Sequence, residues 1–148
     1  MKYLFIDIEA CDGSWGLCEF GYVYTNEKFE ILKKDLILVN PQKKFKLTGR
    51  KKHSNLVLAF KEEEYQDAPS FIKGYKEIKE ILEEKDVIVF GYAILNDIEF
   101  LRKACIRYHL NDFNFKAYDI QKFVFYYDSK RQRQKSLSST ISEKLMKK

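Results

Sequence analysis

The stretch Tyr3-Leu-Phe-Ile-Asp7-Ile-Glu9-Ala decides the fold class, because it is a short apolar run that ends in two acids. The apolar run over residues 2–8 is nearly continuous, which predicts a strand buried on both faces. Alternate residues of a strand point to the same side, so Asp7 and Glu9 are expected to leave one face close together. The sequence therefore predicts a pair of carboxylates at the end of a core strand.

Two readings of this pair remain open on the motif alone. Like charges held so close repel each other, and the pair is relieved by a cation between them. Carboxylate oxygens on a rigid strand suit Mg²⁺ or Mn²⁺. The alternative is a solvated strand end with two surface acids, since so short a motif often occurs by chance.

The remaining pattern predicts an α/β domain with a mixed five-stranded sheet flanked by helices. Three strands come first, joined by turns, and a helix–strand–helix–strand–helix order follows after Pro69. The strands are expected over residues 2–8, 17–24, 29–39, 86–90 and 114–118. Residues 42–64 read as loop with a short helical turn around 55–60. The helices are expected from residue 71, from about residue 98 with Asn96 or a neighbour as cap, over 119–127, and from Ser136.

Length and composition favour one domain, residues 1–148, with 45% hydrophobic residues and no stretch of transmembrane length. The apolar run before Asp7 is too short for a signal peptide, so we expect a cytoplasmic protein. Three cysteines without metal-site spacing are expected to be reduced thiols.

The formal net charge of +5 is small, and the positions of the basic residues are more informative than the net charge. One basic cluster spans residues 43–52 and another spans residues 130–135. Such clusters are able to meet phosphates, but most basic loops are simply solvated.

A third acid, Asp97, lies near the predicted start of a helix that follows a strand. Its charge is favoured there by the helix dipole and by free N–H groups, so ordinary capping is one reading. The other reading follows from topology, because Phe100 and Leu101 anchor the helix while its start faces the carboxyl ends of parallel strands. That placement brings Asp97 towards Asp7 and Glu9.

At this point the chain resembles the DEDD-type 3′–5′ exonucleases of the ribonuclease-H-like superfamily. The Asp7-Ile-Glu9 pair is similar to the family's first motif, and Asn96-Asp97 ahead of Phe100-Leu101 is similar to its second. A further match stands between the two motifs, in the order and spacing of the family, at Asp67-Ala-Pro69-Ser-Phe71. The three leading strands are also those of the family.

The resemblance implies a two-metal mechanism with Mg²⁺ or Mn²⁺ that releases nucleotides from single-stranded DNA or RNA 3′ ends. It implies that Asp7, Glu9 and Asp97 are both metal ligands and catalytic residues. In that scheme Asp7 bridges two ions, Glu9 holds the one that activates water, and Asp97 serves the other.

The chain departs from the family at the third motif, a His or Tyr base followed by a fourth acid, which has no counterpart. Asp119 is a tempting substitute, but we interpret it as a structural helix cap. Without a base, turnover is expected to fall by about 10²–10⁴-fold. We therefore expect a domain truncated at its C-terminus, or one whose closing helix comes from a partner chain or a second copy.

Two other functions remain open. One is a catalytically inactive relative that binds nucleic acid through basic loops and aromatic stacking. The other is a module that serves only protein interactions.

Overall fold

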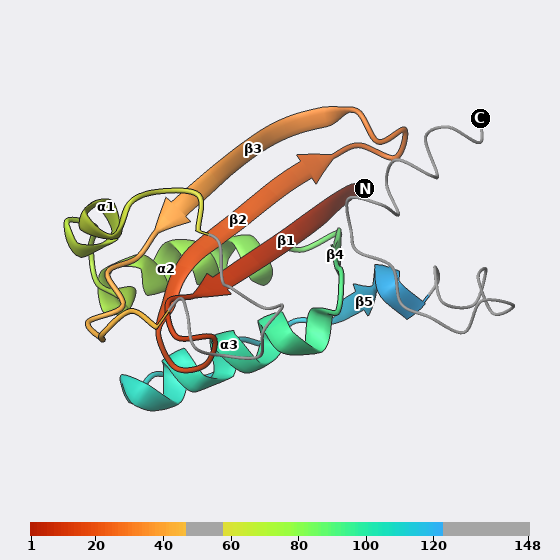
Figure 1. Cartoon of the computed structure of the whole chain (residues 1–148). Coiled ribbons are helices and arrows are strands. Elements are labelled where there is room, and N and C mark those ends of the chain that lie inside the picture. Colours follow the sequence, from red (N-terminus) through yellow and green to blue (C-terminus); the bar gives the residue numbers. More distant parts are fainter. Residues whose placement is uncertain (47–57, 123–148) are drawn as a thin grey trace, which may run out of the picture.

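The computed structural model describes residues 1–46 and 58–122 (Figure 1). A five-stranded sheet with strand order β3-β2-β1-β4-β5 forms its centre. The antiparallel strands are β1 (Lys2–Ala10), β2 (Leu17–Thr25) and β3 (Ile31–Leu38). Strands β4 (Val87–Gly91) and β5 (Ala117–Asp119) continue the sheet in the parallel sense. The predicted mixed sheet with three leading antiparallel strands is confirmed.

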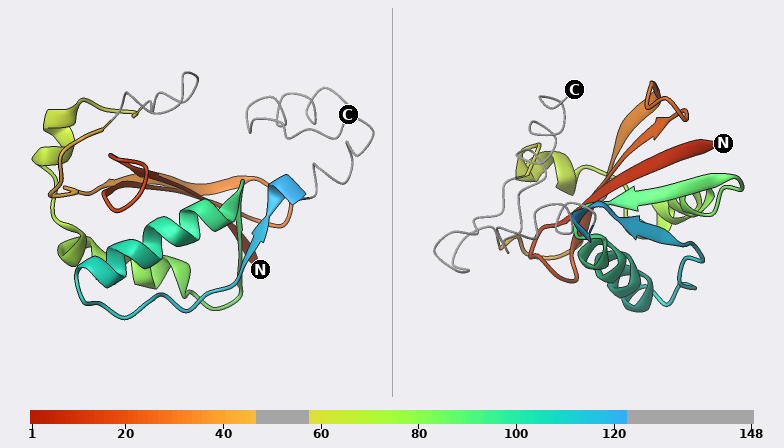
Figure 2. Two further views of the ribbon diagram at one scale, coloured as in Figure 1. Left: turned by 60° about the horizontal axis from the view of Figure 1, so that its bottom comes forward. Right: turned by 90° about the vertical axis from the view of Figure 1, so that its right-hand side faces the viewer.

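Strand β1 is buried on one face only, so the prediction of burial on both faces was wrong. Leu4, Ile6 and Ile8 are at most 4% exposed, whereas Asp7 on the opposite face is exposed and Glu9 is half-buried. The reason is visible in Figure 2, where the two long helices lie on the same side of the sheet. The other face of β1, which we call the open face, carries both acids.

The two long helices are α2 (Phe71–Leu82) and α3 (Ile94–Arg107). Each presents an apolar stripe at helical spacing to the sheet, as the sequence predicted. Helix α3 begins at Ile94, earlier than expected, so Asn96 lies inside the helix and the cap is neither Asn96 nor a residue next to it. The cap residue is Ala93, in the left-handed conformation at φ 51°, and its N–H donates to Asp119 Oδ1 at 2.9 Å.

A short helix, α1 (Glu62–Gln66), lies in the polar stretch that was predicted to be loop. Tyr65 is fully buried there and packs with Cys11 and Cys18 in a second, small core. This buried tyrosine explains why a helix forms in so polar a segment. Residues 58–60 of the predicted helical turn are not helical, and 55–57 lie outside the described residues.

The predictions near the C-terminus are tested only in part. Residues 120–122 are helical, as expected, while 123–127 and the helix from Ser136 lie outside the described residues. The three cysteines are free and buried, which agrees with the expected thiols. In the described part of the chain, no helix is long and apolar enough to cross a membrane.

Candidate functional site

Asp7 and Glu9 lie where β1 runs beyond its parallel neighbour. The pairing of β1 with β4 ends at Phe5 and Phe90, so the last residues of β1 have a strand neighbour, β2, on one side only. Because alternate residues share a face, both carboxyl groups stand on the open face, at the carboxyl end of the parallel strands. This is the edge at which open α/β sheets place their ligands.

Asp97 occupies the gap that β4 leaves beside β1. It lies in the first turn of α3, is only 5% exposed, and accepts the backbone N–H of Ile8 at Oδ1 over 3.0 Å. The carboxylate thus satisfies a main-chain donor that a longer β4 would have taken. The structure therefore brings Asp97 to the residue that separates Asp7 from Glu9, as the topology predicted.

The pKa values of all three acids are raised, and burial is the largest cause for each. The pKa of Asp97 is raised to about 8, first by burial and then by the charges of Asp7, Glu9 and Asp119, against the opposing effect of the Ile8 hydrogen bond. Burial, followed by the charges of Asp7 and Glu19, raises the pKa of Glu9 to about 7. Although Asp7 is exposed as a residue, the protein around its carboxyl group partly desolvates it, and this raises its pKa as well. Acidic groups that resist ionisation are thus concentrated at one end of the sheet.

The donor chemistry of these acids fits a hard divalent cation, which prefers carboxylate oxygens and neutralises their repulsion. As the side chains stand, no three His, Cys, Asp or Glu groups within residues 1–46 and 58–122 are arranged to hold an ion. The chemistry of the site therefore suits a metal, while its present geometry is not that of a closed coordination shell.

A fourth acid, Glu19, was missed in the sequence. It lies directly opposite Glu9 across the β1–β2 pair, is 5% exposed, and accepts hydrogen bonds from the Tyr65 hydroxyl and from the Ala59 N–H at 3.2 Å. Burial raises its pKa, and the charge of Asp7 adds to this. The signal was a lone acid inside an otherwise apolar strand, Leu17-Cys-Glu-Phe20.

Asp119 has the structural role that the sequence predicted. Its Oδ1 accepts the N–H of Ala93 and the N–H of Gln121, each at 2.9 Å. The side chain thereby ties the end of β5 to the start of α3 and caps the turn of helix that follows it.

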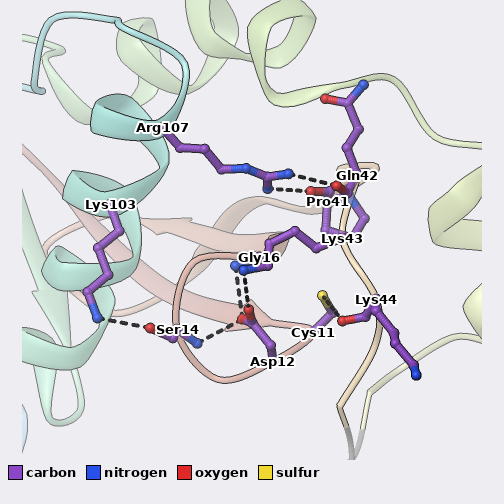
Figure 3. Close-up of polar contacts among 10 residues, drawn as sticks. All are labelled: Cys11, Asp12, Ser14, Gly16, Pro41, Gln42, Lys43, Lys44, Lys103 and Arg107. Carbon is purple, nitrogen blue, oxygen red and sulfur yellow. Dashed lines mark hydrogen bonds and ion pairs between the residues drawn. The ribbon is translucent and has the colours of Figure 1, made fainter.

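The turn between β1 and β2, residues 11–16, directly follows the strand that carries Asp7 and Glu9, and Figure 3 shows the contacts that hold it. Asp12 Oδ1 accepts the N–H groups of Ser14 and Gly16 at 3.0 and 2.9 Å, and Asp12 pairs with Lys43 at 3.1 Å. The Lys103 ammonium, on α3, donates to Ser14 Oγ at 3.0 Å. Lys43 of the first basic cluster is thus engaged within the protein. Residues 47–52 of that cluster and the whole second cluster lie outside the described residues.

The strand order and the helices on one face define a ribonuclease-H-like fold. No family model matches the chain, and no curated protein sequence matches it. Solved structures do match it, among them exonuclease I without ligand, with TM-score 0.68 and 13% identity over 83% of this chain and 30% of that one.

Two further matches are E. coli exonuclease I in complex with oligonucleotides. The complex with dA16 has TM-score 0.66 and 13% identity, and the complex with dT13 has TM-score 0.64 and 12% identity. Each covers 83% of this chain and 29% or 28% of the other, so the chain spans under a third of the length of these proteins. At this identity the likeness establishes the shared fold.

Proposed function

We propose that the chain is a metal-dependent 3′–5′ exonuclease domain that hydrolyses phosphodiester bonds at single-stranded DNA or RNA ends. The observation that carries the proposal is the contact between Asp97 and the Ile8 N–H, which joins the helix-borne acid to the strand-borne pair. The fold shared with exonuclease I, including its complexes with dA16 and dT13, supports the same reading.

Asp7, Glu9 and Asp97 would hold Mg²⁺ or Mn²⁺ in this proposal, with two ions expected from the family resemblance. When bound, such ions activate water and stabilise charge on the phosphate and the leaving 3′-oxygen. The protein's own part is to place the acids: β1 fixes the spacing of Asp7 and Glu9, and the Ile8 N–H fixes the orientation of the Asp97 carboxylate. Because the pKa values of Glu9 and Asp97 are raised, cation binding at neutral pH is expected to release protons.

Turnover by this chain is proposed to be slow. Residues 1–148 hold no match to the motif that carries the general base in the family, and such a base contributes about 10²–10⁴-fold. A slow but metal-dependent nuclease is the expected behaviour.

An inactive nucleic-acid-binding domain is a second candidate, favoured by aromatic side chains on the open face. The ring of Phe90 contacts those of Tyr3, Phe5 and Tyr118 at centroid distances of 5.7, 5.5 and 5.9 Å, and Tyr118 is 53% exposed. Exposed rings of this kind are able to stack on bases of any sequence.

Digestion of a 5′-labelled single strand, DNA and RNA in parallel, tests the proposal. The chain is incubated with Mg²⁺, Mn²⁺ or EDTA beside the Asp7→Ala variant and the control Asp35→Asn, which removes an exposed acid on β3. We expect a ladder that shortens from the 3′ end, is lost with EDTA and in Asp7→Ala, and persists in Asp35→Asn. Binding of the oligonucleotide without any cleavage would favour the inactive binding domain instead.

A further inference from the structure

The inference concerns Glu19, and it rests on the proposed metal-dependent function. Glu19 and Glu9 face each other across the antiparallel β1–β2 pair. Side chains in directly opposite positions have Cβ atoms about 4.5–5.5 Å apart, and like charges in such positions are destabilising. A buried carboxylate at this position therefore opposes folding unless something else compensates for it.

The partners of Glu19 come from residues 58–66, a segment distant in sequence. The Tyr65 hydroxyl accepts the N–H of Phe60 at 3.2 Å, so its single proton is directed to Glu19 Oε1. The Ala59 N–H donates to the same oxygen at 3.2 Å. Glu19 thus anchors this segment to the open face of the sheet, beside Glu9.

These hydrogen bonds do not by themselves explain a charged residue. A glutamine oxygen accepts the same two donors without a charge, and without repulsion from Asp7 and Glu9. The Ala59 N–H and the Tyr65 hydroxyl both reach Oε1, and the described part of the chain supplies no hydrogen bond to Oε2. The negative charge of Glu19 is therefore available to attract a cation held by Glu9.

We propose that Glu19 is a positioning residue for the carboxylate site: fixed by Tyr65 and Ala59, it strengthens the hold of Asp7 and Glu9 on a divalent cation. It lies beside Glu9 on the neighbouring strand, with Oε1 held by Tyr65 and Ala59, so we assign it an electrostatic effect rather than a place among the ligands. For a dication and a carboxylate roughly 7 Å apart in a water-like dielectric, Coulomb's law gives about a five- to tenfold effect on cation affinity.

Mn²⁺ binding at low ionic strength, measured by isothermal titration calorimetry, tests this without requiring catalysis. Two variants separate charge from shape. Glu19→Gln keeps the acceptor and removes the charge, whereas Glu19→Asp keeps the charge but is too short to keep the Tyr65 hydrogen bond in place. The matched control is Glu63→Gln, which removes an exposed acid from the same segment.

We expect Glu19→Gln to weaken Mn²⁺ binding about five- to tenfold, and Glu19→Asp to weaken it less, although Glu19→Asp is the less stable protein. Glu63→Gln should bind as the unaltered chain does. If Glu19→Gln binds Mn²⁺ as tightly as the unaltered chain, the inference is refuted and Glu19 only anchors residues 58–66. The comparison of Glu19→Gln with the unaltered chain tests the inference even if Glu19→Asp fails to fold.

The proposed function and this inference fail in different ways. Should the unaltered chain bind Mn²⁺ but cleave nothing, the exonuclease proposal fails and the Glu19 comparison still stands. Should it bind no more Mn²⁺ than Asp7→Ala does, the cation site itself is absent and both are refuted.

Discussion

Replacing Asp97 by asparagine should stabilise the ion-free protein, by an amount that grows with pH. Burial and the neighbouring acids raise the pKa of Asp97 from 3.8 to about 8. The folded chain therefore holds a proton that the unfolded chain has lost between these values. A raised pKa contributes stability that is present below pH 3.8 and is lost as the pH rises through about 8. Asparagine has no carboxyl proton to lose, so the variant keeps its free energy of unfolding while the unaltered chain loses stability between pH 3.8 and about 8.

The magnitude follows from the same values. Each pH unit within the window changes the free energy of unfolding by at most about 1.4 kcal/mol, which sets an upper limit of about 5 kcal/mol at pH 8. Local relaxation and water penetration reduce this, and we expect a gain of about 2–3 kcal/mol. Asparagine also keeps an oxygen to accept the Ile8 N–H. Alanine does not, and an unpaired buried N–H costs about 1–3 kcal/mol.

Urea unfolding in EDTA at pH 5 and pH 8 measures these differences. Asp97→Asn should gain little at pH 5 and more at pH 8, and Asp97→Ala should be less stable than Asp97→Asn at both. A gain for Asp97→Asn that does not change with pH would show that Asp97 is ionised throughout, and would refute the reasoning.

Three further predictions concern backbone conformation, packing and a side-chain hydrogen bond, and the free energy of unfolding in urea tests each. Ala93→Gly should stabilise the protein by about 0.5–1 kcal/mol, because Ala93 is left-handed at φ 51°; a loss would mean that the conformation is not strained. Gly16→Ala should destabilise by about 1–3 kcal/mol, since its new Cβ would lie 2.5 Å from Cys11 Sγ. The control Gly74→Ala, inside α2 with its nearest contact at 4.0 Å, should instead stabilise by about 1 kcal/mol. Arg107→Met should lose about 1–3 kcal/mol, because the guanidinium donates to the carbonyl oxygens of Pro41 and Gln42. Its control Arg102→Met breaks only an exposed ion pair with Glu99 and should leave the stability almost unchanged.

The sequence was sufficient for the elements whose pattern is local. The aromatic-rich run of β2, the helical stripe of α2 and the acids at the end of β1 can each be recognised within one segment. The approach of Asp97 to β1 was also predictable, because it needs only the rule that parallel strands end at the same edge.

What the sequence did not reveal depends on contacts between distant segments. Helix α1 exists because Tyr65 is buried against Cys11 and Cys18, which local polarity conceals. The hydrogen bonds that hold Glu19 come from donors 40 and 46 residues away. The start of α3 is set by Asp119, which lies 26 residues beyond Ala93. Each of these is a tertiary effect that overrides local propensity.

The firmly held turn between β1 and β2 gives this protein an intrinsic optical probe. It carries Trp15, the single tryptophan of the chain, which is 38% exposed and has the Lys103 ammonium 5.5 Å from its ring. An indole ring responds to nearby charge, and Lys103 reaches the turn from the same helix that carries Asp97. If a cation or an oligonucleotide binds at the acids as proposed, we expect tryptophan emission to report it, with no label added to the protein.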